Sequence, residues 1–154
     1  MRKFLKLFRS IAISATSIFT VLKLLPLRSP FGFKIGPSAI LLITSTVAAH
    51  EAGHYFSARS QNLEVEPPIV ISAGPIAIGL TKIKKYHRAS KESKIFILRS
   101  GPLTGITFAL ALVIIFWFIG RKRQALTSLL IACKEFSSLF IGSDARKIRQ
   151  QKAK

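Results

Sequence analysis

Apolar residues along the chain gather in long blocks that are separated by basic or broken segments. The blocks cover residues 11–27, 38–49, 101–120 and 125–141. The third of them, "GPLTGITFALALVIIFWFIG", has the roughly 20 residues that a helix needs to cross the hydrocarbon core of a bilayer. This pattern predicts an all-α integral membrane protein with about four transmembrane helices.

The block at 38–49 begins as a helix is expected to begin. Gly36 and Pro37 precede it, and proline is tolerated at the first helical position because its missing N–H has no partner there. At 1.5 Å per residue the block makes about 18 Å of helix, against a hydrocarbon core roughly 30 Å thick. We therefore expect the next residue, His50, to lie within the depth of the membrane.

The segment at 66–83, "EPPIVISAGPIAIGLTKI", differs in kind from the apolar blocks. It is rich in β-branched residues and is interrupted by Pro and Gly, which favours strands joined as a short, membrane-associated β-hairpin. The following "TKIKKYHRASKESK" predicts a basic, water-exposed loop with a short amphipathic helix near its end. In this interpretation His87 is solvated and the next spanning helix begins at Gly101.

These features divide the chain into three parts. Residues 1–35 are an N-terminal anchor or interfacial segment, residues 36–148 a membrane-embedded core, and residues 149–154 a basic tail. Residues 1–27 combine a basic start with a short apolar stretch, which also describes a secretory signal peptide. Whether they are cleaved, interfacial or spanning stays open at this stage.

Charge gives the expected orientation. The chain has 24 Lys and Arg against 6 Asp and Glu, for a net charge of +18. Most of these cations flank the apolar blocks, as loop charges of a membrane protein do, so nucleic acid is not the expected partner and the lipid bilayer is. The positive-inside rule places the N-terminus, the 59–99 segment and the C-terminal tail together in the cytoplasm, with four crossings between them.

Two of the three histidines and a glutamate interrupt the apolar run in "TSTVAAHEAGH". His50, Glu51 and His54 form an HExxH pattern, which puts two imidazoles on one helix face within reach of one metal ion. Zn²⁺ suits such ligands and leaves a position for water, which Glu51 would deprotonate. A lone intramembrane acid costs on the order of 3 kcal/mol, which a bound dication offsets. The competing interpretation is that "HEAGHYFSARSQ" is only the water-exposed end of the helix.

The chain resembles the site-2 protease family of intramembrane zinc metalloproteases, over roughly residues 36–148. The resemblance rests on "HEAGH", on the hairpin segment "SAGPIAIGLTKI", on "RSGPLTGITFALAL" and on "IGSDARKI", in the family's order. In pattern it is closest to compact plastid and cyanobacterial members. The resemblance implies a zinc metalloendopeptidase that cuts membrane-spanning proteins or signal-peptide remnants, with residues 36–148 as its metalloprotease core.

The resemblance also implies the site residues. His50, His54 and Asp144 are expected to hold the zinc ion, with Glu51 as the catalytic residue that activates a zinc-bound water. The chain departs from the family pattern beside that aspartate. The family's Gly is replaced by Ala145, and its Asn and Pro fall near Ser137 and Phe140.

Those departures keep a second function open: a proteolytically inactive member of the family that binds a metal or a membrane partner. A third possibility is a small membrane subunit in which HEAGH is incidental. The expected location is multi-pass in a bacterial plasma membrane with both termini cytoplasmic, and an organelle membrane and any oligomeric state stay open. Lys134 and Glu135 interrupt the last apolar block, and because they are adjacent no direct pair between them is expected.

Overall fold

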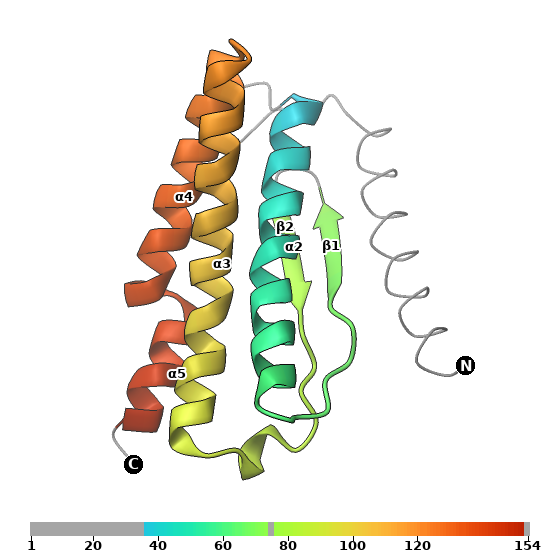
Figure 1. The fold of residues 1–154 in the computed structure, drawn as a ribbon, viewed down its shortest axis with the longest axis vertical. Helices are drawn as coiled ribbons and strands as arrows, with labels where there is room; N and C mark the ends of the chain where they lie inside the picture. The colour runs from blue at the N-terminus through green and yellow to red at the C-terminus, as the bar shows by residue number, and fades with distance from the viewer. Residues whose placement is uncertain (1–35, 74–75, 153–154) are drawn as a thin grey trace, which may run out of the picture.

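The computed structural model describes residues 36–73 and 76–152, and Figure 1 shows how they are arranged. The three long helices are α2, α3 and α4; α3 runs antiparallel to the other two and packs against both (Figure 1). A two-stranded hairpin lies along α2, and a short helix α5 continues from α4. The predicted N-terminal anchor lies outside the described residues.

Helix α2 spans Pro37–Ser60 and begins as predicted, with Gly36 as an extended cap and proline in the first turn. It remains helical through the whole HEAGH segment. His50 and His54 are therefore one turn apart on the same face, as the spacing predicts.

Helix α3 spans Lys91–Phe118, so the predicted start at Gly101 was wrong. Ser90 caps the helix by accepting a hydrogen bond from the Ser93 amide at 3.1 Å, in the pattern typical of a helix N-terminus. The Gly-Pro pair that suggested a boundary lies inside the helix, where Pro102 is fully buried.

A tight turn at Gly120, whose φ of 77° favours glycine, leads into helix α4, Lys122–Ile141. The helix breaks at Gly142, whose extended backbone separates it from α5, Ser143–Lys152. This break places Asp144 in the first turn of a new helix.

The hairpin predicted from the Gly- and Pro-rich segment is confirmed. Strand β1, Ile69–Ala73, pairs antiparallel with β2, Ile76–Leu80, and an isolated bridge between Val65 and Ile83 extends the pairing. The two faces of the hairpin differ in exposure: Val70 of β1 is buried on one face, whereas Ile78 of β2 is 65% exposed on the other. The hairpin thus packs one face on α2 and leaves an apolar face uncovered by the described residues.

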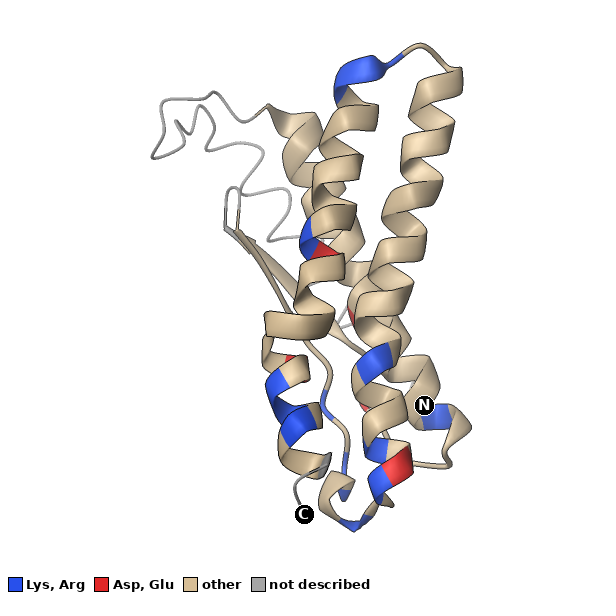
Figure 2. Cartoon of the chain, turned by 90° about the vertical axis from the view of Figure 1, so that its left-hand side faces the viewer, with Lys and Arg blue, Asp and Glu red and all other residues tan. Residues whose placement is uncertain are grey.

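Two helical segments of the described residues are long and apolar enough to cross a membrane, Lys91–Phe118 and Lys122–Gln151. The predicted helical membrane fold is confirmed to that extent, and α2 is not among these two. Lys and Arg are concentrated at two places (Figure 2). One is the end of the bundle that holds α5 and the segments joining the hairpin to α2 and α3, and the other is the α3–α4 turn. The 61–90 segment and the tail therefore share one end, as the expected topology requires.

Small residues bring α2 and α3 into close contact. A Cβ at Gly53 would lie 2.5 Å from the Ser100 carbonyl oxygen and 2.6 Å from the Thr104 hydroxyl. Beside it, the Ser100 hydroxyl is 2.6 Å from the Ser57 hydroxyl and donates to the Gly53 carbonyl at 3.0 Å. Close backbones joined by hydroxyl hydrogen bonds are typical of helix pairs in membranes.

We expect Gly53→Ala to lower the free energy of unfolding by about 1–3 kcal/mol, because the new methyl group would overlap the α3 backbone. Unfolding in mixed micelles measures this. Gly36→Ala is the control, since its Cβ would meet only one atom, at 4.0 Å. Equal stability of the two variants would contradict the close contact.

Candidate metal centre

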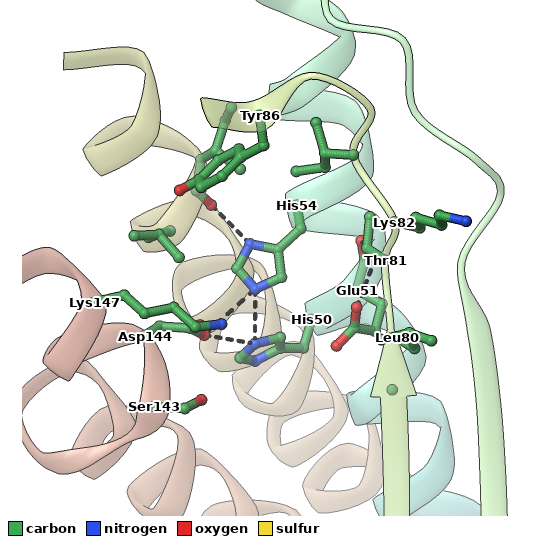
Figure 3. Close-up of a pocket in the computed structure, with 14 residues that line it drawn as sticks. His50, Glu51, His54, Leu80, Thr81, Lys82, Tyr86, Ser143, Asp144 and Lys147 are labelled. Carbon is green, nitrogen blue, oxygen red and sulfur yellow. Dashed lines mark hydrogen bonds and ion pairs between the residues drawn. The ribbon is translucent and has the colours of Figure 1, made fainter. Parts of the chain in front are cut away.

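Three potential metal ligands from two helices meet in space. His50 and His54 of α2 bring their Nε2 atoms to 3.2 Å from each other, and Asp144 of α5 places Oδ2 3.4 Å from each of those nitrogens (Figure 3). The three ligand atoms lie within 4.8 Å of one another, and this is the group in the described residues that could hold a metal ion. The structure thus brings Asp144 to two histidines that lie about 90 residues before it in the sequence.

The other ring nitrogens settle which atoms face the centre. His50 Nδ1 is 2.8 Å from Glu135 Oε2, and His54 Nδ1 is 2.7 Å from the Ile97 carbonyl oxygen. Carboxylate and carbonyl oxygens accept hydrogen bonds, so we assign the N–H of each neutral ring to Nδ1. The lone pair of each Nε2 is then directed at the other ring and at Asp144.

This donor set fits zinc. Three lone-pair atoms at such distances repel one another unless a proton or a metal ion lies between them. Ligands 2.0–2.1 Å from a tetrahedral zinc ion are about 3.3 Å apart, which matches the 3.2 and 3.4 Å separations. A set of three protein ligands, here two imidazoles and one carboxylate, is typical of a catalytic zinc site, in which the fourth position takes water or substrate. A structural zinc site has four protein ligands.

A glycine of α3 makes room for one of the rings. A Cβ at Gly101 would overlap three ring atoms of His54, so the imidazole lies directly against the α3 backbone. The same stretch of α3 supplies the Ile97 carbonyl that accepts from this ring. Gly101 and Pro102 therefore lie inside α3, and the missing side chain of Gly101 leaves space for the His54 ring.

Glu51 lies beside the three potential ligands, and the hairpin contacts its side chain. Its side chain is buried, and Thr81, just after β2, donates a hydrogen bond to Oε2 at 2.5 Å. A Cβ at Gly79 would overlap the glutamate side chain, so strand β2 packs directly on it. Figure 3 shows Glu51 on the hairpin side of the two histidines, with Asp144 opposite.

A groove runs past these residues between α2 and the hairpin on one side and α4 and α5 on the other. It consists of three adjoining cavities of about 630, 340 and 480 Å³. The first two share His50, Glu51 and Asp144, and the second and third share Lys134 and Glu135. His50, Glu51 and Asp144 thus lie where the first two cavities meet, and the third cavity, lined mainly by apolar residues, extends from the second.

Tyr86 and Lys147 line the first cavity around the ligands. Burial, with a smaller contribution from the Asp144 carboxylate, raises the pKa of the Tyr86 phenol above its usual value, so it stays protonated at neutral pH. The Lys147 ammonium lies 3.9 Å from Asp144 Oδ1. A neutral phenol and a cation therefore line the cavity beside Asp144.

Sequence reasoning missed Glu135 and was wrong about its neighbour. Lys134 Nζ donates to Glu135 Oε1 at 2.6 Å, because a long lysine side chain can fold back to a carboxylate on the adjacent residue. The available signal was an acid inside an apolar block. For Thr81 and Gly79 no local signal exists, since both act through the packing of the hairpin on α2.

The departures from the family pattern have different consequences in space. Ala145 is buried, yet Asp144 still reaches both histidines. Ser137 is exposed and donates to the Cys133 carbonyl of its own helix at 2.9 Å, so its hydroxyl is not directed into the groove. His87 is exposed, as predicted, and lies outside the ligand group.

A comparison with protein-family models matches residues 38–150, most of the chain, to Peptidase family M50. This confirms the resemblance to site-2 proteases, which are membrane proteins and in general zinc metalloproteases. The closer likeness to compact plastid and cyanobacterial members stays a prediction. No curated protein and no solved structure matches the chain significantly.

We expect the purified chain to bind close to one zinc ion, and His54→Ala and Asp144→Ala each to lose most of it, because two ligands hold zinc far more weakly than three. Zinc content per chain in detergent measures this. His87→Ala is the matched control and should keep the parent content. Zinc that survives Asp144→Ala would exclude this aspartate as a ligand.

Proposed function

The chain belongs to peptidase family M50, and on that premise we propose that it is a zinc metalloendopeptidase that hydrolyses peptide bonds of membrane-spanning substrates. The observation that carries this proposal is the convergence of His50, His54 and Asp144 beside the buried Glu51. Metal ligands alone are also found in storage or structural sites. A carboxylate on the same cavity, next to a free coordination position, is what hydrolysis requires in addition.

His50, His54 and Asp144 would hold the zinc ion. When bound, zinc polarises a peptide carbonyl and lowers the pKa of water, so that water becomes a nucleophile at neutral pH. The chain's own contribution is to fix these side chains before substrate arrives. The Ile97 carbonyl orients the His54 ring, and the Gly142 break presents Asp144 to both histidines.

Glu51 is the proposed general base. It takes a proton from the attacking water and delivers it to the leaving amine, so the proton count of the cycle balances. The Thr81 hydroxyl is bonded to Oε2, which leaves Oε1 to accept that proton. Burial against Gly79 keeps the carboxylate from rotating away, because strand β2 closes one side of it.

The groove and the hairpin supply a path for the substrate. A helical segment must unwind before its peptide bonds become accessible, and an extended segment can then pair with the edge of a sheet. Within the described residues β2 pairs with β1 alone, and Ala77 to Leu80 of β2 line the groove. We propose that substrates, membrane proteins or signal-peptide remnants, add to this edge and pass the ligands in extended form.

The groove also fits a membrane origin of the substrate. The third cavity is lined mainly by apolar residues of α2, β2 and α4, among them Ile43, Ile76 and Leu130. Lys82 and Lys147 line the first cavity. Lys and Arg are also concentrated at that end of the bundle (Figure 2). We propose that this end faces the cytoplasm, in a bacterial plasma membrane or an organelle membrane, with residues 36–148 as the catalytic core.

One observation favours a second function. Ser137, near the family's Asn, is exposed and bonded to its own helix, so that position offers no contact to a substrate or transition state. A chain that lacks this contact can keep the metal and lose the chemistry. The alternative is therefore an inactive member that binds a metal or a membrane partner.

Glu51→Gln decides between the two functions. In liposomes with a labelled single-span peptide, we expect the parent to cleave and Glu51→Gln to be about 10²–10⁴-fold slower, because the amide cannot take the proton. Its zinc content should equal that of the parent. Glu92→Gln, at an exposed acid in the first turn of α3, is the control and should cleave like the parent.

Cleavage by Glu51→Gln at the parent rate would overturn the proposed base. A parent that holds zinc and leaves a panel of single-span peptides intact would support the inactive alternative. Since zinc content is measured on the same samples, loss of metal cannot be mistaken for loss of the base.

Thr81→Val tests the connection between the hairpin and the base. Removing the hydroxyl frees the Glu51 carboxylate from β2, so we expect kcat to fall by about 10-fold through misplacement of the base. KM and zinc content should change little, because Thr81 contacts none of the three ligands. Thr107→Val is the control, since that hydroxyl bonds only to its own helix. An unchanged kcat would contradict a role for the hairpin in placing Glu51.

A further inference from the structure

Glu135 is the most deeply buried of the six acids, with 1% of its surface exposed, compared with 9% for Glu51. It lies within the apolar segment Lys122–Gln151, where an ionised carboxylate costs on the order of 3 kcal/mol unless it is paired. The proposed hydrolysis gives it no proton to carry and no ligand position. Its presence in the middle of α4 therefore needs a separate reason.

Both carboxylate oxygens are occupied. Oε2 accepts from His50 Nδ1 at 2.8 Å, and Oε1 accepts from Lys134 Nζ at 2.6 Å. The lysine side chain is 69% exposed and lies along the groove, so the cation that keeps Glu135 ionised is at the surface of the channel. An ionised carboxylate has no proton to donate, so His50 must donate from Nδ1.

Helix α3 holds the same carboxylate from a third direction. A Cβ at Gly105 would lie 3.2 Å from Glu135 Oε2 and 3.3 Å from its Cγ, so the side chain rests on the α3 backbone. His50 comes from α2 and Glu135 from α4. The hydrogen bond thus spans the bundle at a point where three helices meet.

We propose that Glu135 is a positioning residue for the metal centre: it fixes the ring of His50 so that Nε2 faces His54 and Asp144, and it increases the basicity of that nitrogen. The inference rests on the proposed function, because it presupposes that the three residues bind zinc. A carboxylate behind a histidine ligand acts in this way in metal sites, where its loss costs 10–100-fold in metal affinity.

The competing explanation is purely structural, with Glu135 only tying α4 to α2. The two explanations differ in what they predict for the metal-free protein. A positioning residue changes zinc affinity while the metal-free bundle stays folded. A structural residue lowers the stability of the metal-free bundle, and any loss of zinc follows from that.

The test is zinc affinity of the full chain in detergent, by competition with a chromophoric chelator, for the parent, Glu135→Gln and the control Glu92→Gln. We expect Glu135→Gln to bind zinc 10–100-fold more weakly and the control to match the parent. Thermal unfolding in the presence of a chelator should give nearly the same Tm for all three proteins. The Tm increase on adding zinc should be smaller for Glu135→Gln alone.

Glu135→Asp is the second variant, because it keeps the charge and withdraws the carboxylate from His50. It should fall between the parent and Glu135→Gln in affinity, and Co²⁺ bound in place of zinc should show an altered visible spectrum. Parent affinity in both variants overturns the inference. Unfolding of both metal-free variants overturns it in favour of the structural role. A parent that binds no zinc overturns the proposed function together with the inference.

Discussion

Ionisable side chains in an apolar helix bundle must neutralise one another, and this constraint organises the structure around His50. Its two ring nitrogens face different partners: Glu135 on one side, and His54 with Asp144 on the other. Lys134 in turn balances Glu135. A chain of hydrogen-bonded polar groups therefore crosses from the groove to the group of His50, His54 and Asp144, and each member makes the next one less costly to bury.

Backbone proximity is the second condition for this arrangement. Gly53 lets α2 lie on α3, Gly101 gives the His54 ring its place, and Gly105 does the same for the Glu135 carboxylate. In each case the absent side chain is what allows a polar group to reach its partner. These three helical glycines thus act through packing, without any unusual backbone conformation.

The parts of the fold that follow from local pattern could be predicted from the sequence. The four-residue spacing of His50 and His54 predicts their common face, and the Pro- and Gly-rich segment predicts the hairpin. The start of α3 was missed because Gly101-Pro102 is typical of a helix boundary, whereas here the helix continues through the pair and its backbone lies against His54. Asp144 was found by resemblance alone, and the role of Glu135 depends on how α4 docks on α2, which no local pattern encodes.

The position of Asp144 has a consequence for how the protein is made. The ribosome completes α2, with both imidazoles, well before it reaches the helix break at Gly142 and the aspartate that follows. During that interval the two histidines can meet a metal ion only without Asp144, the proposed third ligand. The group of three residues therefore assembles only after α5 has been synthesised and has docked against α3 and α4.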